Sequence, residues 1–268
     1  MADDGTRRLQ LIGGGKMAEA LLGGLVEHGW AAASQLHVVE PLPERRAELA
    51  ASRPGLSVGD AAVVGVDAVL AVKPDVVPAV LPALAEAAPP RVLSIAAGVR
   101  CDAIETGLPA GTAVVRSMPN TPALVGQGAA AIAPGVAAGD HDLRWAEGIL
   151  AAVGTVVTVA ESDLDAVTGL SGSGPAYVFL LAEALTAAGV ARGLEPSVAD
   201  ALTRQTLLGA ATLLAESGEE PAALRANVTS PGGTTAAGLA VFADGDLMGL
   251  VDAVVAAATA RSVELGGG

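Results

Sequence analysis

The stretch RLQLIGGGKMAEALLGGL, residues 8–25, decides the fold of the amino-terminal part of the chain. Its apolar start predicts a strand over Leu9–Ile12, and the residues after the glycines predict a helix over about 16–28. Gly13, Gly15 and Ala18 have the spacing of a dinucleotide-binding fingerprint, which combines a tight turn, a close approach to a pyrophosphate and close helix packing. The stretch therefore predicts a Rossmann-type turn.

The acid that follows the next strand supports this interpretation, because a glycine-rich turn alone also occurs in other α/β proteins. Glu40 ends the predicted strand Leu36–Glu40, where an acid that binds the ribose 2′-hydroxyl belongs. Its carboxylate would repel the 2′-phosphate of NADPH, whereas Arg45 and Arg46 could bind that phosphate or simply face solvent on a helix over 43–52. We expect NADH or NADPH as the cofactor, with a slight preference for NADH.

The alternation of apolar runs and helical stretches up to about residue 160 is typical of a parallel sheet covered on both faces. After Asp163 no strand is predicted, and two long helices and a final stretch, Asp246–Leu265, account for most of the remainder. The fold class is therefore α/β, with a Rossmann-type dinucleotide-binding domain at 1–162 and an all-helical C-terminal dimerisation domain at 163–268. Further strands are expected at Ala68–Val72, Val92–Ile95, Ala113–Ser117, Ala129–Ile132 and Thr155–Val159, and further helices at about 75–86, 101–106 and 139–152.

The helices of the second domain predict its role in assembly. The second long helix and the final stretch are apolar over most of their circumference, so each must bury two faces. We expect a homodimer, since small enzymes are mostly symmetric oligomers, with an internal helical cap of a monomer as the alternative.

Composition limits the classes of partner. The formal net charge of −14 disfavours nucleic acid and anionic membranes, because a phosphate backbone requires clustered Lys and Arg, so a small molecule is expected. Cys101 is the sole cysteine, which excludes an intramolecular disulfide and a cysteine-based metal site. The sequence lacks a run of about 18 to 20 uncharged apolar residues, and MADDGTRR has no apolar segment behind its charges. We therefore expect a cytoplasmic protein without a membrane span or a metal.

Two further segments end at the sheet edge where ligands of open α/β sheets bind. LAVKP, residues 70–74, places Val72 and Lys73 at the end of a strand, and SIAAG, residues 94–98, places Ala96 and Ala97 at the end of the next. Small residues allow a close backbone approach; for Lys73 a surface cation is the alternative. The cofactor-binding residues expected in this half are Ile12, Gly13, Gly15, Lys16, Met17, Ala18, Glu40, Val72, Lys73, Ala96 and Ala97.

Three other segments are rich in Gly, Pro, Ser, Thr and Asn: RSMPNTPALVGQG (116–128), GLSGSGPAYVF (169–179) and NVTSPGGTTAAGL (227–239). With IGGGKMAEA, AVKP and SIAAG, they resemble the signature stretches of the pyrroline-5-carboxylate reductase family, in order from Arg8 to about Leu265. The resemblance implies dimers, rings of dimers, and the reduction of 1-pyrroline-5-carboxylate to L-proline by a hydride from NAD(P)H, the final step of proline biosynthesis.

The substrate of this reaction needs a receptor for its carboxylate. A glycine-rich loop that opens a helix offers unpaired N–H groups. The resemblance assigns the loop to Ser230, Gly232, Gly233, Thr234 and Thr235, and makes the Thr235 hydroxyl a donor or proton relay at the ring nitrogen. The alternative is that Thr234 or Thr235 only caps the helix.

Four more positions match residues that the family places near its ligands. Glu161 would favour the iminium form of the substrate by its negative charge, with a solvated loop residue as the alternative. Asn227 matches a residue that touches the cofactor from the helical domain, and its alternative is a local turn contact. Met118 and Asn120 match residues near the nicotinamide, although a turn also explains the composition of MPNTP.

Two rival functions share parts of this pattern. A related β-hydroxyacid-type NAD(P) dehydrogenase or a deazaflavin-dependent NADP reductase has the same plan, but a hydroxyacid enzyme would place a Lys on the interdomain helix, and GLSGSGPAYVFLLAEAL has none. A non-catalytic dinucleotide-binding protein is the other, and the intact SPGGTT loop speaks against it. The chain departs from many family members at Glu40 and Asp60, where polar residues suited to a 2′-phosphate would stand, so strict NADPH preference is not implied.

Overall fold

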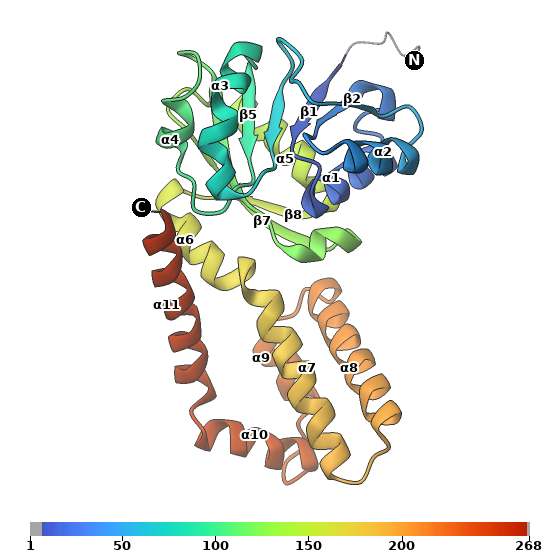
Figure 1. Ribbon diagram of the computed structural model, residues 1–268. Helices are drawn as coiled ribbons and strands as arrows, with labels where there is room; N and C mark the ends of the chain where they lie inside the picture. The colour runs from blue at the N-terminus through green and yellow to red at the C-terminus, as the bar shows by residue number, and fades with distance from the viewer. Residues whose placement is uncertain (1–6, 267–268) are drawn as a thin grey trace. The chain divides into compact units, whose positions relative to one another are not determined.

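The computed structural model describes residues 7–266, which divide into two units (Figure 1). The first unit runs to Ser173 and resumes at Ala256, and the second comprises Gly174–Val255. Residues 1–6, which make up most of the stretch MADDGTRR considered above, lie outside the described range.

The centre of the first unit is an eight-stranded sheet in the order β3-β2-β1-β4-β5-β6-β7-β8. The first six strands run parallel, whereas β7 is antiparallel to β6 and parallel to β8. The expectation of a parallel sheet is therefore wrong for its last two strands, because an apolar run does not encode direction. The strands are β1 (Leu9–Ile12), β2 (Leu36–Val39), β3 (Ser57–Gly59), β4 (Ala68–Leu70), β5 (Arg91–Ser94), β6 (Ala113–Met118), β7 (Gly128–Pro134) and β8 (Gly154–Thr158).

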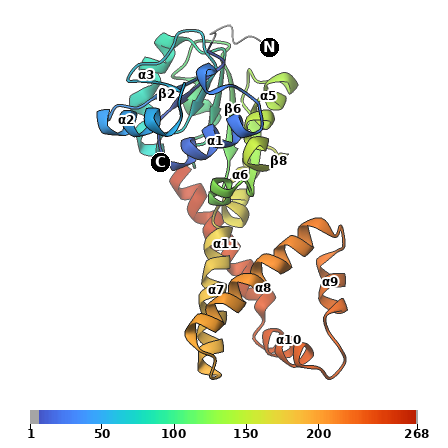
Figure 2. The same ribbon diagram turned by 90° about the vertical axis from the view of Figure 1, so that its right-hand side faces the viewer.

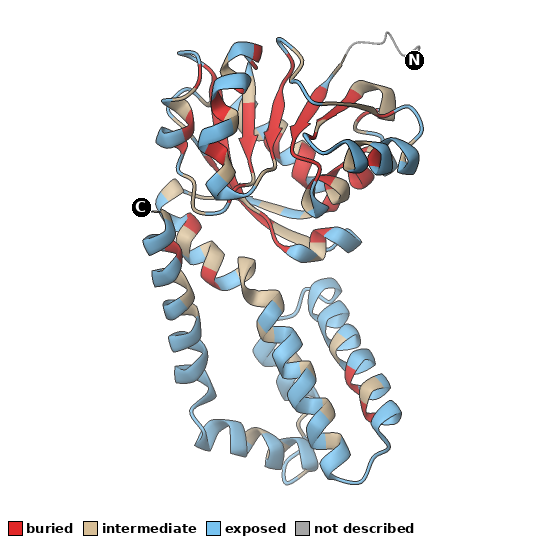
Figure 3. Cartoon of the chain, viewed as in Figure 1, coloured by how far each residue is buried: buried red, intermediate tan, exposed pale blue. Residues whose placement is uncertain are grey.

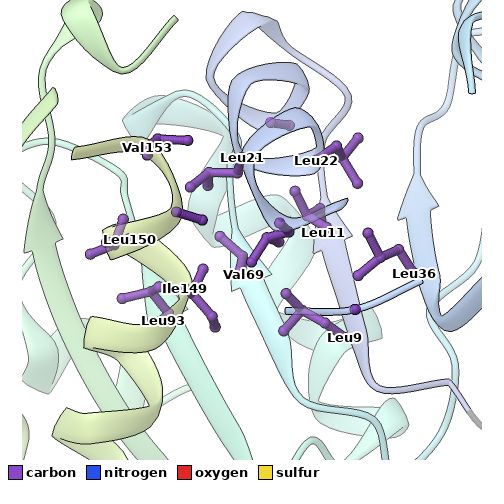
Figure 4. Packing of buried hydrophobic residues seen from close by; sticks show 14 of the residues in the cluster. Leu9, Leu11, Leu21, Leu22, Leu36, Val69, Leu93, Ile149, Leu150 and Val153 are labelled. Atoms are coloured by element: carbon purple, nitrogen blue, oxygen red, sulfur yellow. The ribbon is translucent and has the colours of Figure 1, made fainter. Parts of the chain in front are cut away.

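Helices cover both faces of this sheet, and alternate residues of its central strands point to opposite faces. Leu11, Val69 and Leu93 are fully buried with α1 (Lys16–Glu27) and α5 (Asp140–Leu150), as Figure 4 shows. Their neighbours Ile12, Leu70 and Val92 pack with α3 (Val77–Ala87) and α4 (Cys101–Glu105) on the other face. The helix α2 (Pro43–Ser52) follows β2 and buries Leu49. Because the first six strands are parallel, their carboxyl ends meet at one edge of this doubly covered sheet.

The helices after β8 begin with α6 (Leu164–Val167), which continues through a π-helical turn, Thr168–Gly172, into α7 (Gly174–Ala191). In the second unit α7 packs against α8 (Pro196–Glu216), as Figure 2 shows. Two shorter helices follow, α9 (Pro221–Asn227), which the sequence did not predict, and α10 (Thr234–Asp244), whose start after the glycine-rich loop was expected. The last helix, α11 (Leu247–Gly266), begins in the second unit and ends in the first.

Most residues of the helices of the second unit are exposed in a single chain (Figure 3), and many of them are large apolar residues. α7 has no buried residue, and only Ala199 and Thr203 of α8 are buried. Phe179 is 62% exposed and Val241 is 72% exposed. Contiguous apolar surface of this kind marks an interaction site.

One helical stretch in the described part of the chain, Glu161–Ala191, is long and apolar enough to cross a bilayer by length and composition. A search for uncharged runs overlooks it because Glu183 interrupts the apolar residues of α7. The same stretch contains the solvent-open face of α7, so a protein partner is an alternative cover for it.

Candidate active site

The three glycines between β1 and α1 have different surroundings. Gly13 has φ +104°, and a Cβ there would lie 2.8 Å from the Ala71 carbonyl oxygen and 3.0 Å from Cγ1 of Val72. A Cβ on Gly14 would lie 2.6 Å from Cδ1 of Leu49 on α2, whereas one on Gly15 would meet no atom within 4 Å. The turn is thus packed at its first two glycines and open at Gly15, where a ligand can approach the backbone.

The amino end of α1 presents free donors beside this opening. Gly15 is the N-cap, and the first backbone bond of the helix runs from the N–H of Glu19 to the carbonyl of Gly15, at 3.0 Å. The first three N–H groups of the helix, from Lys16 to Ala18, lie before that bond and can meet an anion. Ala18 is fully buried, as expected of the small third residue of the fingerprint. Lys16 is 82% exposed and pairs with Glu19 at 3.3 Å.

The carboxylate of Glu40 lies against the glycine turn and is nearly buried, with 8% of the residue exposed. One oxygen accepts the N–H of Gly14 at 3.1 Å and the other accepts the N–H of Leu42 at 3.0 Å. The acid at the end of β2 therefore holds the turn itself, and its remaining lone pairs are what a ribose hydroxyl could use.

Neither arginine that follows Glu40 is simply solvated. The Nε and Nη2 of Arg45 both donate to the Gly14 carbonyl at 2.9 Å, and its other contacts are with Glu19 and Glu48, each at 2.8 Å. The Nη1 of Arg46 donates to the carbonyls of Glu40 and Pro41. Sequence reasoning offered a phosphate or solvent as the partners of Arg45 and missed its contact with the turn, since contacts across 31 residues leave no local pattern.

The other expected cofactor residues lie at or near the carboxyl edge. Val72 touches the glycine turn, as the distance at Gly13 shows, whereas Lys73 is exposed and precedes a short 3₁₀ turn. Ala96 is buried and Ala97 is exposed after β5. Met118 ends β6 and is partly buried against a small core cluster with Leu164.

Asn120 is buried and its side chain is already used. Its Nδ2 donates to the carbonyl of Ser171 at 3.0 Å, and its Oδ1 accepts the N–H of Ala129 at 2.8 Å. The amide thereby ties the π-helical turn to β7.

The carboxylate of Glu161 is bound within the first unit. Its Oε1 lies 3.2 Å from Nη1 of Arg116 and accepts the N–H of Cys101 at 2.7 Å. Burial, and then the charge of Glu161, raise the pKa of the Cys101 thiol to about 12. Glu161 is therefore no free loop residue, and Arg116 balances its charge.

The glycine-rich loop of the second unit opens a helix as expected. Gly233, and not Thr234 or Thr235, is the N-cap of α10, without a side-chain capping bond. The capping alternative for either threonine is wrong. The first backbone bond runs from Ala237 to the Gly233 carbonyl, so the N–H groups of residues 234–236 precede it. The residues from Ser230 to Thr235 are exposed except for partly buried Gly233.

Two protein-family models match this chain, one in its amino-terminal half and one in its helical half. Residues 8–98 match the family model of NADP oxidoreductase, coenzyme F420-dependent, and residues 161–265 match pyrroline-5-carboxylate reductase dimerisation. A pyrroline-5-carboxylate reductase of Synechocystis sp. is 46% identical over 97% of this chain and 98% of its own length. One of Mycobacterium leprae is 44% identical over 96% of this chain and 96% of its own. The chain belongs to the pyrroline-5-carboxylate reductase family.

Solved structures of the pyrroline-5-carboxylate reductase family have the same fold. The reductase of Coxiella burnetii matches with a TM-score of 0.92 at 34% identity, covering 97% of this chain and 98% of its own. That of Plasmodium falciparum, with NADP bound, matches with a TM-score of 0.81 at 28% identity and the same coverage. Membership of this family makes the helical half a dimerisation domain, which accounts for the open apolar faces of α7 and α8.

The family's two sets of expected ligand residues lie in different units. The glycine turn and the carboxyl edge belong to the first unit, and Asn227 with the Ser230–Thr235 loop belongs to the second. Asn227 ends α9, and its Nδ2 donates to Glu219 at 3.1 Å, which is the local contact named as its alternative.

Proposed function

We propose that this protein reduces 1-pyrroline-5-carboxylate to L-proline with a hydride from NADH or NADPH. The observation that carries the proposal is the match at 46% identity over 97% of the chain, which includes the glycine turn and the helix-opening loop together. A related hydroxyacid dehydrogenase and a non-catalytic binding protein are disfavoured, because full-length relatives carry the reductase name.

The residues of the glycine turn fit a dinucleotide. The open side of Gly15 and the N–H groups at the start of α1 would hold the pyrophosphate, and the Glu40 carboxylate would accept a hydrogen bond from the adenosine ribose. Ile12, Val72, Lys73, Ala96, Ala97, Met118, Asn120 and Asn227 complete the proposed cofactor set. The dinucleotide, when bound, supplies the hydride.

The loop of the second unit would bind the substrate. Its free N–H groups at residues 234–236 suit a carboxylate, and with Ser230, Gly232 and Gly233 they form the proposed receptor. The Thr235 hydroxyl is not used as a cap, so it is available to hydrogen-bond the ring nitrogen. A protonated cyclic imine is already electrophilic, so orientation and hydrogen bonding are what the protein must add.

The histidines do not supply a general acid in this proposal. His37 bonds Ser57 and the Ala61 carbonyl, and burial lowers its pKa. His28 contacts the Gly24 carbonyl at the end of α1, and His141 lies on α5. None of the three stands in the motifs assigned to ligands.

The proposal also covers the assembly of the protein and its cellular location. The dimerisation domain indicates a homodimer; we propose that dimers associate into a ring and that the protein acts in the cytoplasm. We place the boundary between the dinucleotide-binding and helical domains at residues 162 and 163. Light scattering on the purified protein would measure the mass of the assembly, and the mass of a single dimer would exclude a ring of dimers.

A steady-state assay with pyrroline-5-carboxylate tests the function and the cofactor together. Oxidation of NADH or NADPH that depends on the imine, with proline as product, is expected. A well-folded dimer that binds the dinucleotide without turnover would support the non-catalytic alternative, and oxidation of a β-hydroxyacid with NAD(P) would support the dehydrogenase. The same assay without the imine is the negative control.

A further inference from the structure

The starting observation is that side chains from the β2–α2 segment hold both backbone groups of Gly14. Glu40 accepts its N–H at 3.1 Å, and Arg45 donates twice to its carbonyl oxygen, at 2.9 Å each. Leu49 fills the space beside it, where a Cβ would lie 2.6 Å from Cδ1. Three side chains, those of Glu40, Arg45 and Leu49, therefore hold the middle residue of the glycine turn in place.

We propose that Arg45 is a positioning residue for the cofactor, which orients the Gly14–Gly15 peptide toward the pyrophosphate. Because its guanidinium is engaged in these contacts, it does not bind a 2′-phosphate, and the protein prefers NADH to NADPH. The inference rests on the proposed function only in taking the dinucleotide to lie at the glycine turn.

The first part follows from the planarity of the peptide. The carbonyl of Gly14 and the N–H of Gly15 belong to one planar trans unit and point in opposite directions. Fixing the carbonyl oxygen against Arg45 therefore fixes the direction of the Gly15 N–H, away from α2. Gly15 is the glycine of the turn whose side is open. A donor held in place before binding loses little entropy when the phosphate arrives.

The second part follows from the partners of the nearby cations. Arg45 is only 22% exposed, and Glu19 and Glu48 each lie 2.8 Å from it. Hydrogen bonds to Glu48 and Glu19 raise the pKa of Arg45. Burial alone would raise the pKa of Glu19, but the hydrogen bonds from Arg45 and Lys16 outweigh it and lower that pKa. Arg46 donates to the carbonyls of Glu40 and Pro41 at 2.8 and 2.9 Å. A 2′-phosphate would have to break these contacts and would face the Glu40 carboxylate, which repels it.

The experiment compares the dissociation constants of NADH, NADPH and ADP for the full-length dimer, by calorimetry, in the wild type and two variants. The wild type should bind NADH at least about 10-fold more tightly than NADPH. Arg45→Gln should weaken all three ligands by a similar factor, about 10-fold, since each contains the pyrophosphate. Arg45→Lys should recover only part of the loss, because one ammonium cannot replace a bidentate guanidinium.

Different effects on KM and on kcat distinguish a positioning role of Arg45 from a general loss of structure. In both variants KM for NADH should rise while kcat at saturating NADH stays within about twofold, and the KM for the imine should not change. Arg204→Gln is the matched control, because Arg204 lies on α8 and pairs with Asp200. It removes the same charge and should leave all dissociation constants unchanged.

Three results would overturn the inference. A loss of NADPH affinity alone in Arg45→Gln would make Arg45 a 2′-phosphate receptor. Unchanged NADH and ADP affinities in Arg45→Lys and Arg45→Gln would show that the clamp has no effect on binding, and equal wild-type affinities for the two cofactors would remove the preference. If Arg45→Gln does not fold, Arg45→Lys decides. Dinucleotide binding without imine reduction would remove the proposed function and leave this inference standing.

Discussion

Arg116 on β6 and Glu161 after β8 form an ion pair with 3.2 Å between Nη1 and Oε1, and Arg116 is only 4% exposed. Removing one partner of a buried ion pair destabilises a fold more than removing one partner of a surface pair, because it leaves a buried charge without compensation. Glu161→Gln is therefore expected to lower the free energy of unfolding by about 1–3 kcal/mol, measured by urea denaturation.

A double variant checks the cause of that loss. Arg116→Met in the Glu161→Gln background removes the unpaired charge and should recover part of the stability. If Glu161 also favours the iminium form of the substrate, kcat/KM of Glu161→Gln should fall with a shifted pH profile. A normal profile in a destabilised variant would leave Glu161 with the ion pair alone.

Thr235 is expected to matter for turnover and not for folding. Because Gly233 caps α10, Thr235→Val removes a hydroxyl that makes no capping bond, and the melting temperature should change little. Loss of one transition-state hydrogen bond should lower kcat/KM at least ~10-fold. Thr235→Ser keeps the hydroxyl and should retain most of the activity. An unchanged rate in Thr235→Val would exclude the hydroxyl from the reaction.

Glu40→Gln is expected to shift the ratio of kcat/KM values toward NADPH. The amide keeps one acceptor for the backbone and removes the charge that repels a 2′-phosphate, which should change the ratio about 10-fold, or ~1.4 kcal/mol. Glu44→Gln, an exposed position on α2, gives the same change of net charge. Equal ratios in both variants would show that the charge of Glu40 does not discriminate.

Cys101 is expected to be unreactive in the folded protein at neutral pH. It is 2% exposed, and its pKa of about 12 leaves the thiolate scarce, so iodoacetamide should label it slowly until urea is added. Rapid labelling of the native dimer would contradict this.

The raised pKa also predicts a loss of stability in alkali. The ordinary value is 9.0, so the unfolded thiol ionises first, and the stabilisation is complete below pH 9 and is lost as the pH rises toward 12. The stability difference between the wild type and Cys101→Ala should narrow above pH 9, by up to about 1.4 kcal/mol per pH unit. A constant difference between pH 8 and pH 10.5 would show that the thiol does not titrate as inferred.

Much of the first unit follows from its sequence because apolar runs and glycine punctuation are local signals. The predicted strand Leu9–Ile12 and the helix over 43–52 match β1 and α2. The short edge strand β3, with three residues, has too few apolar positions to be recognised. The direction of β7 and β8 depends on tertiary pairing, which an apolar run does not specify.

The site shows the same limit. The fingerprint located the glycine turn, and the SPGGTT stretch located the start of α10. The pattern did not reveal that Arg45 grips Gly14 or that Arg116 neutralises Glu161, since each contact joins residues more than 30 positions apart. α9 was missed because it is only seven residues long and lies between segments rich in Gly, Pro, Ser and Thr, which weaken the helical signal.

The path of α11 limits how this protein can be divided. The chain leaves the first unit after Ser173 and returns at Ala256, where Ser262 donates to Asp165 at 2.6 Å. Two covalent connections therefore join the units. A protein shortened to its amino-terminal half would lose the returning helix and expose the surface of α6 that it covers.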